Sequence, residues 1–301
     1  MKREIVLGSL VVVGILSIGV VAWQGATQER VVNVSQVKDN LYMLQGGGGN
    51  TAVFIQSDGV VVVDAKNPGW GQPILARIKE LTDKPVTTLI NTHTHGDHVG
   101  GNVEFPASVD VVVQENTKTN MEKLPIFAEN QNRGMAKRTF TDRMTLGSGA
   151  DQVDLYYFGP GHTNGDAWVV FPAARTVHTG DIFAGKSLPL ADGANGGSVL
   201  HYPDTLRKAH AGITGVDTII AGHTPTTMTW DDLRVFAEFN QDFLTWAQAQ
   251  ITAGKTPEQA AADWSLPAKY EGYSSNVPAL FGGLSGRIQL LAEEMKRAGR
   301  Q

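Results

Sequence analysis

Apolar runs alternate with polar loops along the first two thirds of the chain, and this pattern predicts a mixed α/β fold. Val86–Ile90 is a β-branched, apolar run that predicts a buried strand. Val31–Ala65 is predicted to form consecutive strands joined by turns, with Val60–Val63 as a second buried strand. Pro73–Leu81 carries apolar residues at helical spacing, which predicts a short helix between these two buried strands.

The last third of the chain has the periodicity of helices. Thr229–Ile251 spaces aromatic and aliphatic residues at helical intervals, and Gly254 after it is typical of a C-terminal cap. Thr256–Gln259 has the pattern of a capping box with proline at the first helical position. A final helix is predicted over about Ser285–Ala298. We therefore expect a helical C-terminal part over about 230–301.

The most distinctive segment follows the strand predicted at Val86–Ile90. His93, His95, Asp97 and His98 place three imidazoles and a carboxylate within six residues, and all of these groups are good metal ligands. Alternate residues of an extended segment point the same way, so His93 and His95 can reach one ion. Two ions about 3.5–4 Å apart would divide four such ligands with less strain than one ion. The pattern favours a two-metal site at the carboxyl end of a strand, where α/β folds place their sites.

Three further motifs offer the remaining ligands. They are the GHTNGD segment Gly161–Asp166, the TGD segment Thr179–Asp181 and the GHT segment Gly222–Thr224. Each follows an apolar run that predicts a strand, so each candidate ligand lies on a loop at a strand end. A lone histidine is weak support for a metal site, but four motifs that each carry a ligand type support one strongly.

Taken in order, the motifs HxHxDH, GHTxGD, GD and GHT resemble those of the metallo-β-lactamase superfamily of hydrolases, over about Val31–Thr229. The resemblance implies a four-layer αβ/βα sandwich with the metals at the edge between two mixed sheets. It also implies two metal ions, with a carboxylate that bridges them and a bound hydroxide that completes the pair. By resemblance the ligands are His93, His95 and His162 for the first ion, Asp97, His98 and His223 for the second, and Asp181 for both.

Polar residues around the ligands are expected to have different roles. Asp97 is our candidate catalytic residue, because it is placed to hold the metal-bound hydroxide or to relay its proton to the leaving group. Asp64 follows a predicted buried strand, where the resemblance implies a carboxylate that supports a ligand histidine; without the resemblance, a turn carboxylate is equally plausible. His178 on a strand and His210 on a helix are expected to pack or hydrogen-bond rather than to bind metal.

Three loops are candidates for contact with substrate. Trp70 is an aromatic residue in a loop that can cap an apolar substrate, although packing beneath the loop is slightly favoured. His201 follows the glycine-rich segment Asp192–Ser198 and is a second candidate. The polar stretch Glu115–Phe140 is predicted to form a helical excursion that covers the metal cleft and selects the substrate.

Composition narrows the functional classes. The chain has 301 residues, of which 18% are charged and 42% hydrophobic, which is an ordinary balance for a globular protein. The formal charge of −5 and the lack of a basic aromatic surface argue against a nucleic-acid partner, so we expect a small-molecule substrate. The chain has no cysteine, which excludes lactamase subclasses that use a thiolate ligand, because Asp181 stands at that position. The remaining zinc-lactamase subclass typically has serine there.

The N-terminus differs from the rest. Met1–Arg3 is basic, Ile5–Trp23 is apolar or small, and no charge follows until Glu29. Residues 1–28 are therefore predicted to be a signal peptide or a membrane anchor, and residues 29–301 to form one hydrolase domain. We expect an exported protein, periplasmic or extracellular, or one anchored facing outward, with membrane contact only through this segment if it is uncleaved.

These observations predict a metal-dependent hydrolase. The first hypothesis is a binuclear zinc enzyme that directs a metal-bound hydroxide at a small ester, lactone, thioester or amide. Iron and manganese stay open as the metal, since imidazole and carboxylate ligands suit them too. One alternative is β-lactam hydrolysis. Another is an iron-dependent oxidoreductase on the same fold, which is disfavoured because flavin-linked diiron relatives typically have glutamate where His95 stands.

Overall fold

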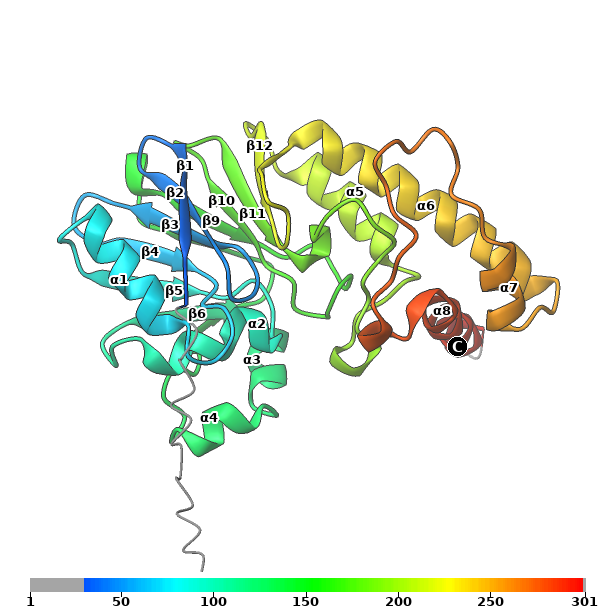
Figure 1. The fold of residues 1–301 in the computed structure, drawn as a ribbon, viewed down its shortest axis with the longest axis horizontal. Helices are drawn as coiled ribbons and strands as arrows, with labels where there is room; N and C mark the ends of the chain where they lie inside the picture. The colour runs from blue at the N-terminus through cyan, green and yellow to red at the C-terminus, as the bar shows by residue number, and fades with distance from the viewer. Residues whose placement is uncertain (1–29, 300–301) are drawn as a thin grey trace, which may run out of the picture.

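A computed structural model describes residues 30–299 and confirms the predicted α/β class, with two β-sheets packed face to face and helices outside both (Figure 1). The segment predicted to be a signal peptide or anchor lies outside the described residues. None of the helices formed by residues 30–299 combines the length and the hydropathy that a membrane crossing requires.

The first sheet has seven strands that follow one another in chain order. Its first four strands pair antiparallel, and the strands from the fourth to the seventh pair parallel. They are β1 (Asn33–Lys38), β2 (Leu41–Gln45), β3 (Thr51–Ile55), β4 (Val60–Val63), β5 (Val86–Ile90), β6 (Asp110–Gln114) and β7 (Arg138–Phe140). The predictions for β4 and β5 are confirmed.

The second sheet has six strands, and only β11 and β12 pair parallel in it. In spatial order they are β13 (Met228–Thr229), β12 (Thr218–Ala221), β11 (Thr176–Gly180), β10 (Trp168–Phe171), β9 (Val153–Tyr156) and β8 (Arg143–Leu146). The carboxyl ends of β9, β11 and β12 lead into the three motifs that the sequence singles out downstream of HxHxDH.

The helices fall into two sets, one on each side of the paired sheets (Figure 1). The α-helices are α1 (Gly71–Leu81), α2 (Gly96–Val99), α3 (Glu115–Met121), α4 (Pro125–Glu129), α5 (Tyr202–Gly212), α6 (Trp230–Thr252), α7 (Pro257–Asp263) and α8 (Gly283–Ala298). Short 3-10 helices are η1 (Gly100–Glu104), η2 (Gly149–Asp151), η3 (Asp181–Phe183), η4 (Gly193–Asn195) and η5 (Ala279–Phe281).

Three hydrophobic cores fill the spaces between the four layers. Successive strand residues point to opposite faces, so Val61 and Val63 of β4 enter the core between the sheets, while Val60 and Val62 enter the core beneath α1–α4. The third core joins β10, β11 and β12 to α5, α6 and α8. This order of helices, sheet, sheet and helices is the four-layer sandwich expected from the motifs.

The C-terminal helices begin where their sequence signals place them. Thr229 caps α6 in a capping box with Asp232, and Thr256 caps α7 in a box with Gln259. The second box was predicted from sequence and is confirmed. The long apolar stripe of α6 packs on the second sheet, with Phe236 and neighbouring aromatic residues fully buried.

Candidate metal centre

The four motifs meet at one edge of the two sheets. His93 and His95 lie in the loop after β5, and Asp97 and His98 lie on the short helix α2 that follows it. The other candidate ligands follow strands of the second sheet: His162 comes after β9, Asp181 after β11 and His223 after β12. The structure therefore brings all seven side chains together from four separate strand ends.

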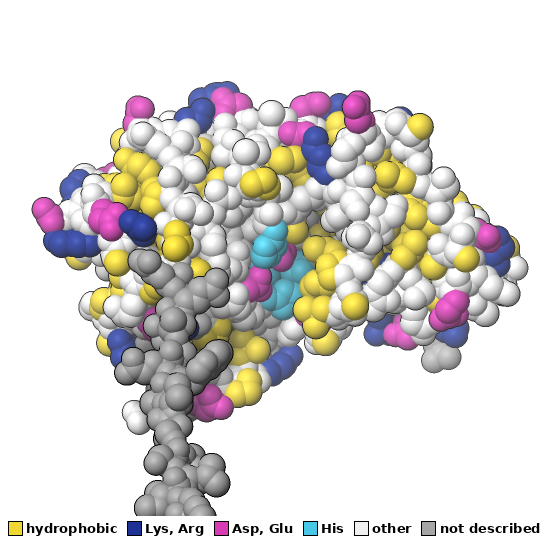
Figure 2. Space-filling model, viewed as in Figure 1, with side chains coloured by type: hydrophobic (Ala, Val, Ile, Leu, Met, Phe, Trp, Pro, Cys, Tyr) yellow, Lys and Arg dark blue, Asp and Glu magenta, His cyan; other side chains and the backbone are white. Residues whose placement is uncertain are grey.

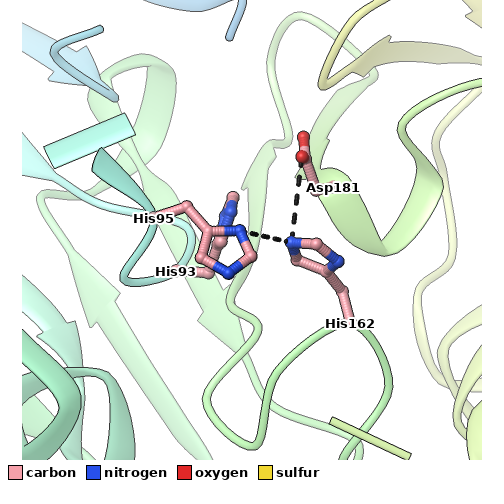
Figure 3. Close-up of side chains that lie close together, drawn as sticks. All are labelled: His93, His95, His162 and Asp181. Atoms are coloured by element: carbon pink, nitrogen blue, oxygen red, sulfur yellow. Dashed lines mark hydrogen bonds and ion pairs between the residues drawn. The ribbon is translucent and has the colours of Figure 1, made fainter. Parts of the chain in front are cut away.

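One group of ligands contains three imidazoles and a carboxylate. His93, His95, His162 and Asp181 each offer one ligand atom, and these atoms all lie within 4.8 Å of one another (Figure 3). His95 Nδ1 lies 2.9 Å from His162 Nε2, and His162 Nε2 lies 3.8 Å from Asp181 Oδ2. Spacings of this size bring the four donors around one point, as a cation requires.

A second group lies beside the first. Asp97, His98 and His223 also offer ligand atoms within 4.8 Å of one another. The Asp181 carboxylate contacts this group as well, with Oδ1 3.3 Å from His98 Nε2 and Oδ2 3.1 Å from His223 Nε2. Asp181 is thus shared by the two groups, which is the position that the motif resemblance implies for it.

The remote nitrogen of each buried ring is held by another group, so that the other nitrogen faces the centre. His98 Nδ1 donates to Asp64 Oδ2 over 2.7 Å, and His95 Nε2 contacts Asp192 Oδ2 over 2.8 Å. His162 Nδ1 hydrogen-bonds the carbonyl oxygen of Leu190. Such contacts fix the tautomer and orientation of metal-binding imidazoles.

Asp64 does more than support one histidine. Its carboxylate also accepts hydrogen bonds from the backbone N–H of Thr92 at 2.8 Å and from the Thr92 hydroxyl at 2.7 Å. The same hydroxyl lies 3.0 Å from His93 Nδ1. Asp64 therefore orients His98 directly and His93 through Thr92, which is the support expected of it from sequence.

The inward-facing atoms fit a bound cation. His93 Nε2, His98 Nε2 and Asp181 Oδ1 are buried and make no well-aligned hydrogen bond within residues 30–299, although the last two lie 3.3 Å apart as an ion-pair contact. An unpaired buried polar atom costs on the order of 1–3 kcal/mol, and more when it is charged. Several such atoms aimed at one point are explained by a metal ion that accepts their lone pairs.

The two groups differ in their electrostatics. Burial, reinforced by neighbouring imidazoles, lowers the pKa of His93 well below its ordinary value and that of His162 to about 3. Burial acts in the same direction on His98, but the charges of Asp181 and Asp64 reverse it and hold the His98 pKa well above 6.5. For His223 burial is likewise outweighed by hydrogen bonds to Asp181 and Asp97, which raise its pKa to about 9.

Two glycines allow the backbone to pass this close to the ligands. A Cβ atom on Gly222 would lie 2.0 Å from Asp181 Oδ1, and one on Gly49 would lie 2.2 Å from His98 Cε1. The loop that carries Gly49 is fixed by buried Lys66, whose Nζ donates to the carbonyls of Leu44 at 2.9 Å and Gly49 at 2.8 Å. Burial lowers the pKa of Lys66 to about 7. Lys66 is a positioning residue that the sequence patterns did not reveal.

The sequence matches the model of a known protein family over the region that contains the site. The family model described as "Metallo-beta-lactamase superfamily" matches residues 44–235, a stretch that contains all seven candidate ligands. The chain belongs to the metallo-β-lactamase superfamily. Its histidine and aspartate side chains form two groups that could hold metal ions.

Relatives within the superfamily include enzymes with different names. A hydroxyacylglutathione hydrolase of Nostoc punctiforme is 29% identical over 165 residues, which cover 53% of this chain and 54% of that protein. A metallo-beta-lactamase type 2 of Elizabethkingia meningoseptica is 27% identical over 227 residues, which cover 69% of this chain and 86% of that protein. The chain thus matches about half the length of the first relative and most of the second.

Solved structures support the fold. A metallo-beta-lactamase from Pontibacter korlensis has a TM-score of 0.59 at 20% identity, with 70% of this chain and 99% of that chain covered. The crystal structure of DIM-1 metallo-beta-lactamase gives a TM-score of 0.56 at 18% identity, with 70% and 97% covered. The superfamily fold accounts for most of the chain, and the family model ends near the start of α6.

An open cavity of about 860 Å³ lies over the metal-binding groups, which appear as histidine and acidic side chains at the centre of the surface in Figure 2. Its floor contains His95, Asp97, Asp181 and His223. Its walls come from the segment 184–192 and from the C-terminal segment 276–281. No sequence motif marks the second of these segments as part of the site.

The prediction that Glu115–Phe140 covers the cleft is wrong. This stretch forms α3, α4 and β7, and none of its residues lines the cavity. Its apolar side chains, including Met121 and Phe127, are buried in the core against the first sheet. The break in the strand pattern therefore marks helices that pack on the sheet and not a lid.

The two candidate substrate-contact residues also lie outside the cavity lining. Trp70 is at the start of α1, where its ring packs over Gly47 and against the first-sheet core. His201 precedes α5, and its Nδ1 lies 2.9 Å from the Ser198 hydroxyl. Both side chains are used for local structure, so neither expectation of substrate contact is supported.

His178 and His210, which were expected to pack or hydrogen-bond, do so. His178 Nε2 donates to the Asn50 carbonyl over 2.9 Å, and its Nδ1 accepts from the backbone N–H of Gly180 over 3.0 Å. His210 lies on α5 and stacks on Trp230 with ring centroids 5.2 Å apart. Neither is among the groups that can hold a metal.

Asp192 and Asp166 are functional carboxylates that sequence reasoning left without a role. Asp192 opens the glycine-rich segment and holds His95. Asp166 ends the GHTNGD motif and accepts from the backbone N–H of Thr163 at 3.0 Å and from its hydroxyl at 2.6 Å. Its place in the motif was a usable signal, because it closes the turn that presents His162.

Proposed function

We propose that the protein is a binuclear zinc hydrolase that cleaves an ester, lactone, thioester or amide bond of a small molecule. The observation that carries this proposal is the Asp181 carboxylate, shared by two groups of ligands at the floor of an open cavity. A shared carboxylate of this kind suits two ions that act together on one reacting centre.

The donor set indicates which residues would hold each ion. His93, His95 and His162 would hold one, Asp97, His98 and His223 the other, and Asp181 both. When bound, zinc supplies a Lewis acid and lowers the pKa of a coordinated water to about 7, which makes a nucleophile available at neutral pH. Imidazole and carboxylate donors suit zinc, and the chain offers no thiolate that would favour a softer ion.

Asp97 is the carboxylate best placed to handle a proton. Its side chain is 32% exposed and lines the cavity, whereas that of Asp181 is 7% exposed. Asp97 Oδ2 lies 3.3 Å from His223 Nε2 and 3.6 Å from His98 Nε2. Burial would raise the Asp97 pKa, but the His223 hydrogen bond and the His98 charge lower it overall. Asp97 is thus ionised at neutral pH. Because Oδ2 faces His98 and His223, the other carboxylate oxygen, Oδ1, is the atom that can accept a proton before passing it to a leaving group.

Metal analysis and a substrate panel test the proposal together. We expect purified protein to bind two equivalents of zinc per chain, to lose turnover on chelation and to regain it with zinc. The panel contains a carboxylic ester, a γ-lactone, a thioester, an amide and a phosphodiester, and we expect hydrolysis within the first four. A protein that binds no transition metal, or that cleaves only the phosphodiester, contradicts the proposal. Stoichiometric iron with redox turnover would instead favour the oxidoreductase.

A β-lactam is the second candidate substrate. It is favoured by the metallo-beta-lactamase of Elizabethkingia meningoseptica, of which the match covers 86%. Nitrocefin turnover with zinc present separates the two candidates. A kcat/KM for nitrocefin above those for all esters and lactones in the panel would make β-lactam hydrolysis the better assignment.

We also propose that the enzyme acts outside the cytoplasm. The basic start and the apolar run Ile5–Trp23 support export or anchoring through residues 1–28. Cell fractionation and mass spectrometry of the mature N-terminus test this. We expect either a chain shortened by the N-terminal segment or full-length protein in the membrane fraction. Full-length protein in the cytosol would contradict the proposal.

A further inference from the structure

The outer wall of the cavity comes from a part of the chain beyond the residues that the family model matches. The match to the family model ends at residue 235, whereas the cavity is lined by Asn276, Pro278, Leu280 and Phe281. In Figure 2, hydrophobic side chains gather beside the histidines on the side of the C-terminal helices. This wall is therefore a property of this chain's C-terminal part.

The wall is apolar and open to whatever enters the cavity. Leu280 is 88% exposed, the highest value for any large hydrophobic residue within 30–299. The Phe281 ring lies 5.9 Å from the His162 ring and 6.1 Å from the His95 ring, between ring centroids. Exposed aliphatic surface is unfavourable in water. A molecule that reaches the metal centre would cover this surface.

The wall is held in place on both sides. Buried Arg287 of α8 donates to the carbonyl of Phe281 and to that of Ala191. On the other side the backbone N–H of Ser274 donates to the Lys186 carbonyl over 2.9 Å. The segment 276–281 is thus fixed to the loop 184–192 that forms the facing wall. A wall held in this way needs little ordering when a ligand binds, which favours affinity.

The charges in the cavity exclude one kind of ligand group. Lys186 is the single lysine or arginine among the cavity-lining residues that the structure describes, and its Nζ lies 2.9 Å from Asp232 Oδ1. The carboxylates that line the cavity belong to Asp97, Asp181 and Asp192. Among the described residues that line the cavity, no lysine or arginine is left unpaired to bind a substrate carboxylate, so the group on this wall is expected to be uncharged.

We propose that Pro278, Leu280 and Phe281 form an apolar subsite that holds the uncharged acyl chain of an ester or lactone, with its carbonyl at the metal centre. This inference rests on the hydrolase function proposed above and narrows its substrate class. It disfavours substrates that would place a carboxylate at the wall.

A series of 4-nitrophenyl esters from acetate to decanoate, assayed with the zinc-loaded full chain, tests the subsite. Burying one methylene group favours binding by about fourfold, so kcat/KM is expected to rise by about that factor per methylene until the cavity is filled. An ester with a terminal carboxylate on the acyl chain should be at least about tenfold slower than its uncharged counterpart. Leu280→Ser and Phe281→Ala should flatten the chain-length dependence.

Val34→Ser is the matched control, because Val34 is another exposed hydrophobic residue and lies on β1 outside the cavity lining. It should leave the chain-length dependence unchanged. Turnover of all esters at one rate, or an unchanged slope in Leu280→Ser and Phe281→Ala, would overturn the subsite while the hydrolase function stands. Failure to cleave any ester, lactone, thioester or amide would overturn the hydrolase function itself.

Discussion

The two groups of ligands are built on different principles, although they share Asp181. The first group, His93, His95 and His162, consists of imidazoles whose remote nitrogens are held by other groups, and burial lowers the pKa of His93 and His162. The second group, defined by Asp97, His98 and His223, is an ion-pair network in which carboxylates raise the pKa of the imidazoles.

This difference has a chemical consequence. Neutral imidazoles of low pKa are ready to donate lone pairs to a cation, so the first group is a preformed metal site. In the second group, protons on His98 and His223 occupy the place that a metal would take, and they must leave when it binds. We therefore expect the first group to bind metal more tightly and with little dependence on pH, and the second to bind later with release of protons.

The largest expected effect comes from removing one ligand of each group. His162→Ala should prevent binding of the first ion and lower kcat/KM by at least about a thousandfold, since it removes one of the three imidazoles that would hold this ion. His223→Ala should retain one zinc equivalent and lose about a hundredfold in kcat/KM. Zinc content and ester hydrolysis measure both, with circular dichroism as the check on folding. Equal zinc loss in the two variants would contradict the difference between the groups.

The second-largest effect is expected from the carboxylates that hold the imidazoles of the two groups. Among the candidate ligand imidazoles, the Asp192 carboxylate contacts only His95, whereas Asp64 supports His98 directly and His93 through Thr92. Asp192→Asn should therefore weaken the first ion alone, by about 10- to 100-fold. Asp64→Asn should weaken both ions, each by a similar factor. Competition with a chromogenic chelator reports the two affinities. An Asp192→Asn protein that loses only the second ion would refute this assignment.

The convergence of the seven candidate ligands was predictable because each motif is local in sequence. A β-branched run predicts a strand, and a histidine or aspartate just after it predicts a side chain at the strand's end. The sheet topology then brings these strand ends together, and no single motif contains the information for that arrangement. What the sequence did not reveal was the support between distant segments: His95 and Asp192 are 97 residues apart.

The cavity wall shows the same limit more clearly. The irregular pattern of Glu115–Phe140 predicted a cover over the cleft, but the stretch packs on the first sheet. The segment 276–281 lies between the helices predicted near Thr256–Gln259 and Ser285–Ala298, and it carries no metal-binding or catalytic motif. That segment lines the cavity, and α8, which follows it, packs against the second-sheet core.

Proton release provides a smaller and more specific test. In metal-free protein the raised pKa of His98 and His223 keeps both protonated at pH 7, so the second ion should displace about two protons and the first close to none. Affinity for the second ion should then rise about tenfold per pH unit for each proton, up to about pH 9 for His223. Calorimetry in buffers of different ionisation enthalpy counts these protons. A first ion that releases as many protons as the second would remove the distinction.

The raised pKa of His223 also predicts how the stability of the metal-free protein depends on pH. The His223 pKa is raised in the folded protein, so its ion pairs with Asp181 and Asp97 stabilise the fold fully below the unfolded value of about 6.5. That stabilisation should be lost as pH rises through about 9. Urea unfolding of the metal-free protein measures the slope, and the His223→Ala variant should show less of it. An identical slope in that variant would assign the pH dependence to other groups.

The smallest expected effect concerns Arg287, which touches no ligand. It holds the Ala191 carbonyl, and the residues on either side of Ala191 contact the first group: Leu190 through His162 and Asp192 through His95. Lysine keeps the charge but cannot donate to the Ala191 and Phe281 carbonyls with a planar fork. Arg287→Lys should therefore weaken the first ion by about threefold to tenfold, below the effect of removing Asp192 itself.

The second ion separates a positional role of Arg287 from a general loss of stability. Because the contacts of Arg287 lead to His95 and His162 and not to His98 or His223, the affinity for the second ion should be unchanged in Arg287→Lys. Its hydrolysis of short and long esters should fall by the same factor if only metal binding is affected. A selective loss on long esters would show instead that Arg287 acts chiefly by placing Phe281 at the cavity wall. Loss of both ions to the same extent would mean that α8 supports the fold as a whole, and the first group would no longer be distinguished by its link to the C-terminal helix.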